Sequence, residues 1–449
     1  MKRLIFTLLF LSILTAITTA QEMTLNECIR YALENNLAYA NKNIESAIAN
    51  EQYVQTKRDF LPTLNAGGSA NKRYGRSIDP TTNTFVNQDF FSMNFYLDSQ
   101  LDLFRGFTRL NTSKFQKIHY LMSRENIKQQ EMEIAFAVMN KYYDVLYFNK
   151  LKDIVKEQVE LTALNLMNTE KLIELGLKAE SDLLEMKAQE ATELHNLVLA
   201  ENQHDMALLA LKNLMNFPVD EDLSVQTEEI PAATDVLFAP DLVYAAALGH
   251  MPGVQHANLD VEAAQKQFNI ARGELSPRLS LGASVYTNYA DSRKEHIDPN
   301  HPDNSALRTI PFRDQWSQNM AQSVYLSLQI PIFNRWNGMS RVKRARLERV
   351  MAQNRQQEEQ QKLYQLISED IQQLKSLQNE RNLLLAKKEA LQEAFVISEK
   401  KLEQGLINVI EFYTAKNQLA QAEADWMRTL LQLKVKEQTI RFYMGEKIY

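Results

Sequence analysis

The chain has 449 residues, more than one ordinary compact core accommodates, so two units or an extended arrangement are expected. Its formal net charge of −6 argues against nucleic acid as a partner. Cysteine occurs once, at Cys28, which excludes an internal disulfide framework. We expect this residue to be a small packed side chain in a core.

The first 20 residues, MKRLIFTLLFLSILTAITTA, predict a signal peptide. Lys2 and Arg3 form its charged start, an apolar run follows, and small residues precede Gln21. Its removal would take two positive charges away and bring the net charge to about −8. Beyond this segment no run of 18 apolar residues predicts a membrane-spanning helix.

Proline is absent from residues 81–217 and from 332–449, which allows very long helices because proline costs about 3 kcal/mol inside a helix. Gly176 and Gly405 interrupt the helical pattern as turns would. Gly106 and Gly338 stand where strands would lead into helices. The helices are expected over 24–58, 105–175, 177–216, 241–273, 340–404 and 406–444.

The chain also repeats itself. FLPTLNAGGS in the first half matches LSPRLSLGAS in the second, and EKLIELGLKAESDLLEMKAQ matches EKKLEQGLINVIEFYTAKNQ, which pairs Gly176 with Gly405. The second half carries about 14 extra residues between its strands. We therefore predict a first structural repeat over 21–217, a linker or equatorial region over 218–240, and a second repeat over 241–449.

Four short segments alternate apolar and polar residues and predict strands, at about 63–73, 90–104, 278–289 and 320–333. SMNFYLDSQLDLF and VYLSLQIPIF show the alternation best. Each is near the 9 to 11 residues of a membrane-spanning strand with an apolar outer and a polar inner face. A small soluble sheet that caps the helices is the alternative, but duplicated hairpins on an exported chain favour the membrane.

With its order of helix, strand, strand, long helix, turn and helix in each half, the chain resembles the TolC family of outer-membrane efflux proteins. The resemblance rests on that duplicated order, on Pro62 and Pro277 before the strands, and on the two glycine–leucine turns. It implies a mainly α, internally duplicated fold with a small β part. A long α-helical barrel is expected beside four transmembrane β-strands per protomer, and three protomers would complete a 12-stranded barrel.

The resemblance also implies a function and partners. The chain is expected in the cell outer membrane, in contact with its lipid, with a helical tunnel that extends into the periplasm. As a homotrimer it would be the passive exit duct of a tripartite efflux or type I secretion system. Its partners would be a periplasmic adaptor protein and an inner-membrane pump of RND, ABC or MFS type.

Candidate site residues follow from the same resemblance, position by position. Gly176, Leu177, Gly405 and Leu406 match hairpin tips that dock onto an adaptor, with a plain turn as the alternative reading. Asp182 and Glu411 match acidic positions of the periplasmic constriction, where three copies would form a carboxylate ring. An N-cap role is the alternative for Asp182.

The sequence departs from the family pattern at three positions near this constriction. Thr414 stands where a second acid is usual, and the tyrosine and arginine of the familiar gate fall on Leu402 and Ile407. We therefore expect a carboxylate constriction without that gate.

Enzyme activity is not expected, because the seven histidines show no metal-ligand spacing and no nucleophile or phosphate-binding motif occurs. No cofactor is predicted. The rival hypothesis is a periplasmic coiled-coil adaptor or structural stalk, which explains the helices but not the strands. The substrate and the class of pump stay open.

Overall fold

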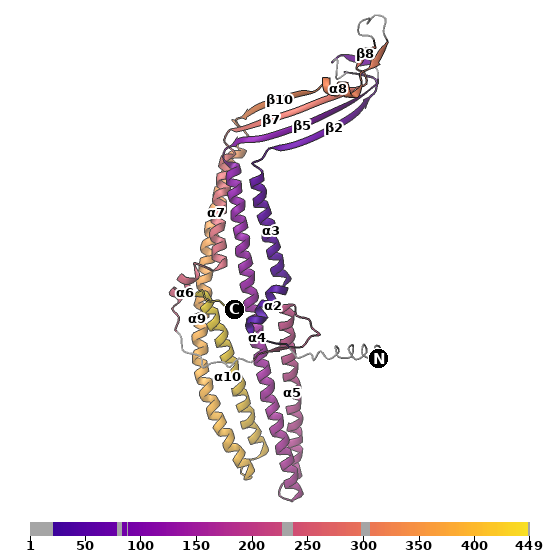
Figure 1. Ribbon diagram of the computed structural model, residues 1–449. Coiled ribbons are helices and arrows are strands. Elements are labelled where there is room, and N and C mark those ends of the chain that lie inside the picture. Colours follow the sequence, from indigo (N-terminus) through magenta and orange to yellow (C-terminus); the bar gives the residue numbers. More distant parts are fainter. Residues whose placement is uncertain (1–20, 79–82, 88, 227–236, 298–305, 448–449) are drawn as a thin grey trace, which may run out of the picture. The chain divides into compact units, whose positions relative to one another are not determined.

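The computed structural model of the chain describes residues 21–78, 83–87, 89–226, 237–297 and 306–447 (Figure 1). The predicted signal peptide lies outside these residues, as does part of the predicted linker. The chain divides into two compact units. The first, here the hairpin unit, comprises Met1–Ser46, Met122–Ala257 and Arg355–Tyr449, and the second, the sheet unit, comprises Ala47–Leu121 and Asn258–Asn354.

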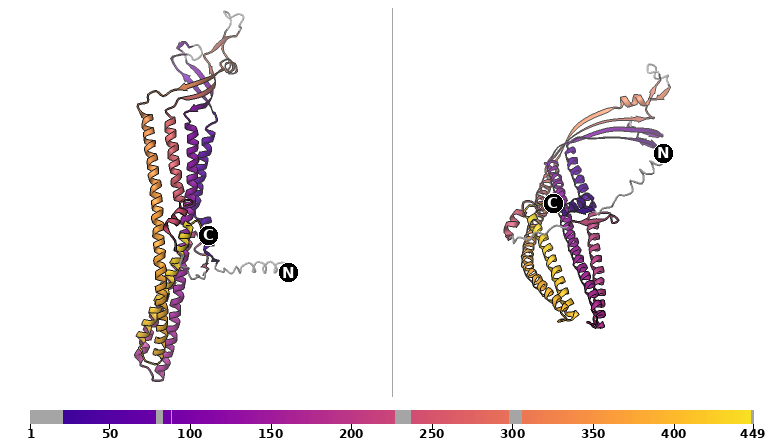
Figure 2. Two further views of the ribbon diagram at one scale, coloured as in Figure 1. Left: turned by 90° about the vertical axis from the view of Figure 1, so that its left-hand side faces the viewer. Right: turned by 60° about the horizontal axis from the view of Figure 1, so that its bottom comes forward.

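Helices account for most of the chain, as the sequence predicted. The two longest, α4 (Thr108–Glu174) and α9 (Asn337–Glu403), are uninterrupted helices of 67 residues each. Each turns back into a shorter helix, α5 (Glu180–Met215) and α10 (Val409–Tyr443). Within the hairpin unit, α4–α5 and α9–α10 form two helical hairpins whose turns lie at the same end (Figures 1 and 2).

Two helices predicted as continuous are each broken once. Residues 24–58 form α2 (Leu25–Asn35) and α3 (Leu37–Arg58), because Asn36 leaves the helix and its side-chain oxygen accepts hydrogen bonds from the amides of Ala38 and Tyr39. Residues 241–273 form α6 (Pro240–Ala247) and α7 (Pro252–Gly273). Pro252 cannot continue the preceding helix, since it lacks an amide donor.

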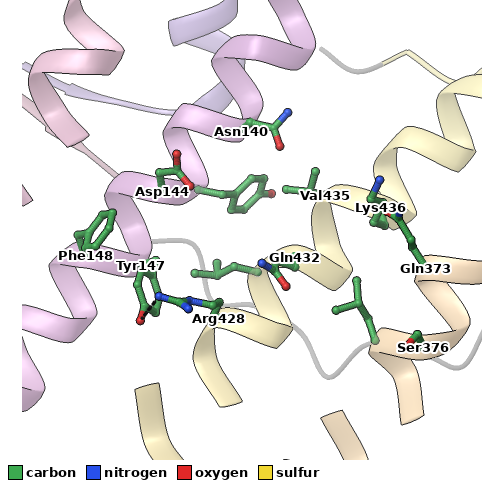
Figure 3. A pocket seen from close by; sticks show the side chains of 13 residues that line it. Asn140, Asp144, Tyr147, Phe148, Gln373, Ser376, Arg428, Gln432, Val435 and Lys436 are labelled. Carbon is green, nitrogen blue, oxygen red and sulfur yellow. Dashed lines mark hydrogen bonds between the residues drawn. The ribbon is translucent and has the colours of Figure 1, made fainter. Parts of the chain in front are cut away.

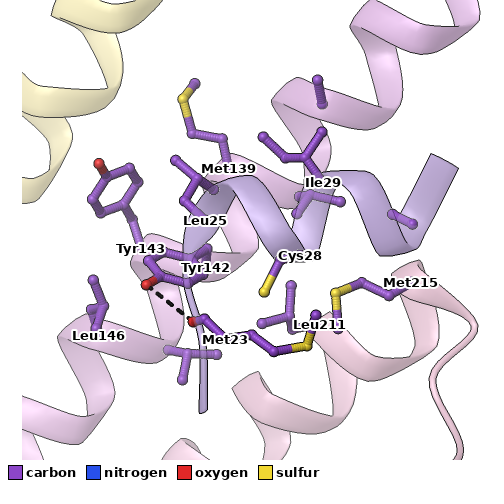
Figure 4. Packing of buried hydrophobic residues seen from close by; sticks show 14 of the residues in the cluster. Met23, Leu25, Cys28, Ile29, Met139, Tyr142, Tyr143, Leu146, Leu211 and Met215 are labelled. Atoms are coloured by element: carbon purple, nitrogen blue, oxygen red, sulfur yellow. Dashed lines mark hydrogen bonds between the residues drawn. The ribbon is translucent and has the colours of Figure 1, made fainter. Parts of the chain in front are cut away.

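The main core of the hairpin unit surrounds α2, where apolar side chains from α4 and α5 converge (Figure 4). A short parallel pair, β1 (Gln21–Met23) with β6 (Leu223–Val225), closes this core, and Tyr142 donates a 2.7 Å hydrogen bond to the carbonyl of Gln226. Cys28 is fully buried here, as predicted. Burial raises the pKa of its thiol to about 12, so it is chemically inert.

The sheet unit contains one antiparallel sheet in the order β10–β7–β5–β2, a single curved layer in Figures 1 and 2. Its strands are β2 (Thr63–Arg73), β5 (Phe90–Arg105), β7 (Arg278–Ala290) and β10 (Ala321–Gln329). The last strand ends four residues earlier than the sequence indicated, just before the segment that contains Pro331. Proline cannot donate to a strand ladder.

The register of the sheet divides its side chains into two faces. Asn65, Asp98, Ser284 and Ser323 are aligned across all four strands, with further serine, asparagine and tyrosine residues on the same polar face. The opposite, apolar face carries side chains from every strand: Leu64, Ala66, Ala70, Met93, Phe95, Leu97, Leu101, Leu279, Leu281, Val285, Val324, Leu326 and Leu328. The alternation in the sequence therefore predicted both faces correctly.

Each hairpin of this sheet contains a glycine beneath a cross-strand tyrosine. Gly67 pairs with Tyr96, and Gly282 pairs with Tyr325. In both pairs the phenol ring lies where a Cβ on the glycine would be. The rings therefore cover the glycines and shield the backbone, a known way to offset the weakness of glycine in a strand.

Small elements beyond the main sheet were not predicted. They are two short hairpins, β3 (Arg76–Ile78) with β4 (Phe85–Asn87) and β8 (Lys294–His296) with β9 (Leu307–Thr309), and one short helix, α8 (Phe312–Gln318). All fall in the polar segments that connect the two strands of each predicted pair, at 73–90 and 290–319. Seven helical residues in a polar segment give too little periodicity for prediction.

Candidate functional site at the helical-hairpin turns

The two hairpin turns have the same backbone geometry. Gly176 and Gly405 are left-handed, with φ of 70° and 69°. The amides of Leu177 and Leu406 each bond the carbonyl five residues back, and each glycine amide bonds the carbonyl three residues back. This is the Schellman arrangement, which favours glycine because a side chain strains a left-handed residue.

The glycines are therefore explained by the turns alone, but the leucines are not. Leu177 is 69% exposed and Leu406 is 67% exposed, so neither contributes substantially to packing within the chain. Leu175, at the end of the first hairpin's long helix, is also exposed. The turns thus present apolar side chains to whatever lies beyond them.

The turns and the first turn of each following helix line a groove of about 1070 Å³. Five of the six predicted site residues line it: Leu177, Asp182, Gly405, Leu406 and Glu411. Gly176 is not among the lining residues. The groove lining includes five carboxylates and two lysines, so its formal charge is negative: Asp182, Glu185, Glu399, Glu403, Glu411, Lys171 and Lys178.

Asp182 and Glu411 occupy the same position, the third residue of their helices. The N-cap of α5 is Ala179, so the alternative reading of Asp182 as an N-cap is wrong. The N-cap of α10 is Asn408, whose side-chain oxygen accepts a 2.8 Å hydrogen bond from the amide of Glu411. Asn408 Nδ2 in turn donates to Glu411 Oε1 at 3.0 Å. The carboxylate of Glu411 therefore holds the capping side chain of Asn408 in place, a contact that the sequence had not indicated.

An apolar cluster lies directly behind the groove. Met186, Val409, Phe412 and Tyr413 are buried together, and Leu402 and Ile407 pack against them with other side chains from α4 and α9. Leu402 and Ile407 are the two positions at which the family resemblance implied a missing gate. In this protein they serve the packing of the hairpins.

One helical turn further along α10, a buried lysine connects the two hairpins. Lys416 is 1% exposed and its ammonium donates 2.7 Å hydrogen bonds to the carbonyl of Gln158 and to Oγ1 of Thr162, both on α4. Glu193 Oε1 on α5 lies 3.6 Å from the same nitrogen, and Gln189 donates to that oxygen. A single cation thus holds α10 against both helices of the first hairpin.

The surroundings of this lysine change its proton affinity. Burial lowers the pKa of Lys416 to about 8, although the nearby carboxylate of Glu193 opposes this effect. Burial raises the pKa of Tyr413, whose ring lies 5.1 Å from the ammonium. Glu190, on α5, adds to that increase.

Sequence analysis missed Lys416 and Glu193, although a signal for the lysine was present. On α10 the intervals from Val409 to Phe412, Lys416 and Leu419 are three, four and three residues, so Lys416 falls on an apolar stripe. A charged residue on an apolar stripe marks a cation that must be paired in the fold. Glu193 also lies on a stripe, since four buried residues of α5 are spaced seven apart: Met186, Glu193, Ala200 and Ala207.

A second groove, of about 610 Å³, lies between α4, α9 and α10 (Figure 3). Arg428 spans part of it, donating a 3.0 Å hydrogen bond to Tyr147 Oη while its guanidinium lies 4.7 Å from the centre of that ring. Lys436, also in its lining, pairs with Asp370, and Tyr443 donates to the same carboxylate. These contacts join α10 to α4 and to α9, so the groove serves the structure of the hairpins and includes none of the predicted site residues.

In the described part of the chain, none of the helices has a stretch long and apolar enough to cross a membrane. The same residues include no group of three or more histidine, cysteine, aspartate or glutamate side chains that could hold a metal ion.

Comparison with known proteins gives a family match over most of the chain. The sequence model of the family described as "Outer membrane efflux protein" matches residues 28–216 and 243–446. The pyoverdine export outer membrane protein OpmQ of Pseudomonas aeruginosa is 27% identical over 241 residues, which are 50% of this chain and 48% of that protein. The chain thus matches about half the length of this curated relative.

Solved structures share the fold at low sequence identity. The channel protein CusC superposes with a TM-score of 0.77 at 16% identity, over 95% of this chain and 93% of that one. The outer membrane protein VceC of Vibrio cholerae superposes with a TM-score of 0.74 at 16% identity, over 95% and 97%. The CmeC outer membrane channel of Campylobacter jejuni gives 0.75 at 15% identity, over 94% and 87%.

Proposed function

Because this chain belongs to the outer membrane efflux protein family, we propose that it is the passive exit duct of a tripartite export system. The family places it in the outer membrane and identifies it as a channel-type protein instead of an enzyme. The mainly α fold with a small sheet is the one expected from the resemblance. Transport energy would come from an inner-membrane pump, with a periplasmic adaptor between pump and duct.

The single observation that carries this proposal is the two-faced sheet. Val324, Leu326 and Leu328 of β10 are all more than 60% exposed on the apolar face, and none of the residues that the structure describes covers them. An apolar surface of this kind suits lipid, and the polar face would line an aqueous passage. Four strands are too few to close on themselves, so we propose that three copies complete a 12-stranded wall.

The exposed turn leucines support docking of an adaptor. Leu177 and Leu406 are held outward by identical turns and are unused by the packing of the chain. Replacing each with serine should leave the helices intact and abolish co-purification of an adaptor. Leu184, exposed on the first turns of α5, gives a matched control, since Leu184→Ser changes the same chemistry away from the turns.

The acidic groove supports the proposed constriction. Three copies of Asp182 and Glu411 around one axis would attract divalent cations. Glu411→Gln keeps an acceptor for Asn408 and removes only the charge, so it should weaken block of the channel by divalent cations. Equal block in wild-type and variant channels would exclude Glu411 from the ring. Asp182→Asn gives the corresponding test for the first hairpin.

A direct test of the duct is reconstitution of the full chain in a planar bilayer. We expect uniform conductance steps and a particle with the mass of three chains in detergent. A monomer that stays soluble without detergent and gives no conductance would reject the proposal.

A further inference from the structure

Helix α8 lies on the apolar face of the sheet. Its aromatic side chains contact strand residues of that face: the ring centres of Trp316 and Phe95 are 5.0 Å apart, and those of Phe312 and Tyr289 are 5.6 Å apart. Phe95 and Tyr289 belong to the apolar face by the strand register. The helix therefore covers the sheet on the side that we assign to lipid, at the end where β7 leads into its loop.

Side-chain amides fix α8 in this place by continuing the strand ladder of β7. The pairing of β10 with β7 ends at Tyr286, which leaves the next residues of β7 without a neighbouring strand on that side, while β5 still pairs with them on the other. Gln315, fully buried, accepts from the amide of Ala290 and donates to its carbonyl, at 3.0 and 2.9 Å. Asn319 donates to the carbonyl of Asn288 at 2.7 Å. The position of the helix is thus specified by hydrogen bonds as well as by ring contacts.

Two aromatic side chains of α8 remain partly exposed. Phe312 is 44% exposed and Trp316 is 37% exposed, even with their contacts to the strands. They extend the exposed apolar band of the sheet, and charged residues such as Arg313 and Asp314 stand beside them. Aromatic residues next to charges are typical of the boundary between hydrocarbon and headgroups.

A second aromatic group lies at the opposite end of the strands. Phe104 ends the apolar face of β5, and Phe107 and Trp336 follow in two equivalent strand-to-helix turns, where both have positive φ. Phe95 and Phe104 are nine residues apart, roughly 30 Å along a strand. With a strand tilt of about 40°, the height is about 23 Å, close to the apolar band of about 25 Å in outer-membrane proteins.

We propose that α8 is an interfacial helix that contacts outer-leaflet lipid and fixes the depth of the sheet in the membrane. The inference rests on the proposed function, because it requires that the apolar face meets lipid. It assigns the upper boundary to Phe312 and Trp316 and the lower one to Phe104, Phe107 and Trp336. The part of β5 before Phe95 then lies outside the hydrocarbon.

The three tryptophans of the chain allow a direct test. Trp336→Phe with Trp426→Phe leaves only Trp316, and Trp316→Phe with Trp426→Phe leaves only Trp336 as the matched control. Each full-length variant is reconstituted in phosphatidylethanolamine–phosphatidylglycerol vesicles that contain nitroxide-labelled lipid. The label is placed near the headgroup or near the bilayer centre, and iodide serves as the aqueous quencher.

We expect both tryptophans to be quenched about two-fold more strongly by the shallow label than by the deep one, as boundary residues should be. Quenching of Trp316 by iodide alone, with Trp336 still quenched by lipid, would overturn the role of α8 and leave the duct intact. Protection of Trp316 from all quenchers would place a second copy on the helix and also overturn it. If neither residue senses lipid, the membrane assignment of the sheet itself fails.

Discussion

The two helical hairpins place a lysine at the same repeat position, eleven residues after the turn glycine, and give it opposite environments. Lys187 on α5 is half exposed and lies 3.8 Å from Glu170 across its own hairpin. Lys416 on α10 is buried and bound to α4 and α5. The two lysines occupy the same position of the repeat, but the role of each depends on whether neighbouring helices cover its face of the helix. Only one of the two lysines can hold the hairpins together.

The largest effect is expected when the buried lysine is removed. Lys416→Met would leave the buried carboxylate of Glu193 without its cation, so we expect a loss of about 3–5 kcal/mol in the local opening free energy of α10. Lys187→Met removes a surface pair and should cost less than about 1 kcal/mol. Hydrogen exchange of backbone amides, followed by mass spectrometry, measures both. Equal losses in the two variants would contradict the comparison.

A change of pH should separate the same two lysines. The folded protein releases the Lys416 proton near pH 8, whereas an unfolded lysine retains it to about 10.5. The unfolded state therefore binds more protons between these values, and stability should rise with pH, by about 2–3 kcal/mol from pH 8 to 10. Above pH 10 the raised pKa of Tyr413 acts in the opposite direction.

Thermal unfolding of the helices, followed by circular dichroism between pH 7 and 10, tests this window. The rise should persist in Lys187→Met and disappear in Lys416→Met. Its persistence in Lys416→Met would assign the effect to another group.

Replacing the turn glycines should destabilise the two hairpins equally, in contrast to replacing the two lysines. Gly176→Ala and Gly405→Ala force a side chain into a left-handed residue and should each cost about 1–2 kcal/mol. No atom lies within 4 Å of either new Cβ, so the cost is backbone strain alone. Gly249→Ala, at an ordinary backbone conformation, is the control and should cost little. Hydrogen exchange measures the opening free energy at each turn, and clearly different losses in the two variants would contradict the prediction.

The smallest expected effect concerns the helix caps. Asn408→Ala should cost about 1 kcal/mol, because it removes the acceptor for the Glu411 amide. Ala179 has a similar extended backbone, so Ala179→Asn should gain a comparable amount at the first hairpin. Together the two changes would remove the N-cap side chain of α10 and give one to α5. Amide exchange in the first turns of α5 and α10 gives the readout.

Sequence reasoning succeeded where one local rule controls the structure. Alternation over 93–102 sets the two faces of β5 up to the bulge at Leu103, and the left-handed requirement of a Schellman turn explains Gly176 and Gly405. The absence of proline allowed two uninterrupted helices of 67 residues. These features depend on residues close in sequence.

Sequence reasoning failed where contacts between residues far apart in the sequence determine the structure. The break at Asn36 depends on a side chain that competes with the helix backbone, and the burial of Lys416 depends on two helices more than 200 residues away in sequence. The position of helix α8 depends on hydrogen bonds between the side chain of Gln315 and the backbone amide and carbonyl of Ala290. None of these partners can be identified from local periodicity.

The tyrosine–glycine pairs of the sheet have a consequence for the width of the proposed passage. Tyr96 and Tyr325 project from the polar face, but their rings recline over Gly67 and Gly282 on the adjacent strand. A phenol ring that lies flat against the sheet projects less far into the passage than one that points away from the sheet. In the proposed trimer, two glycines per chain would thereby keep six tyrosine rings out of the centre of the passage.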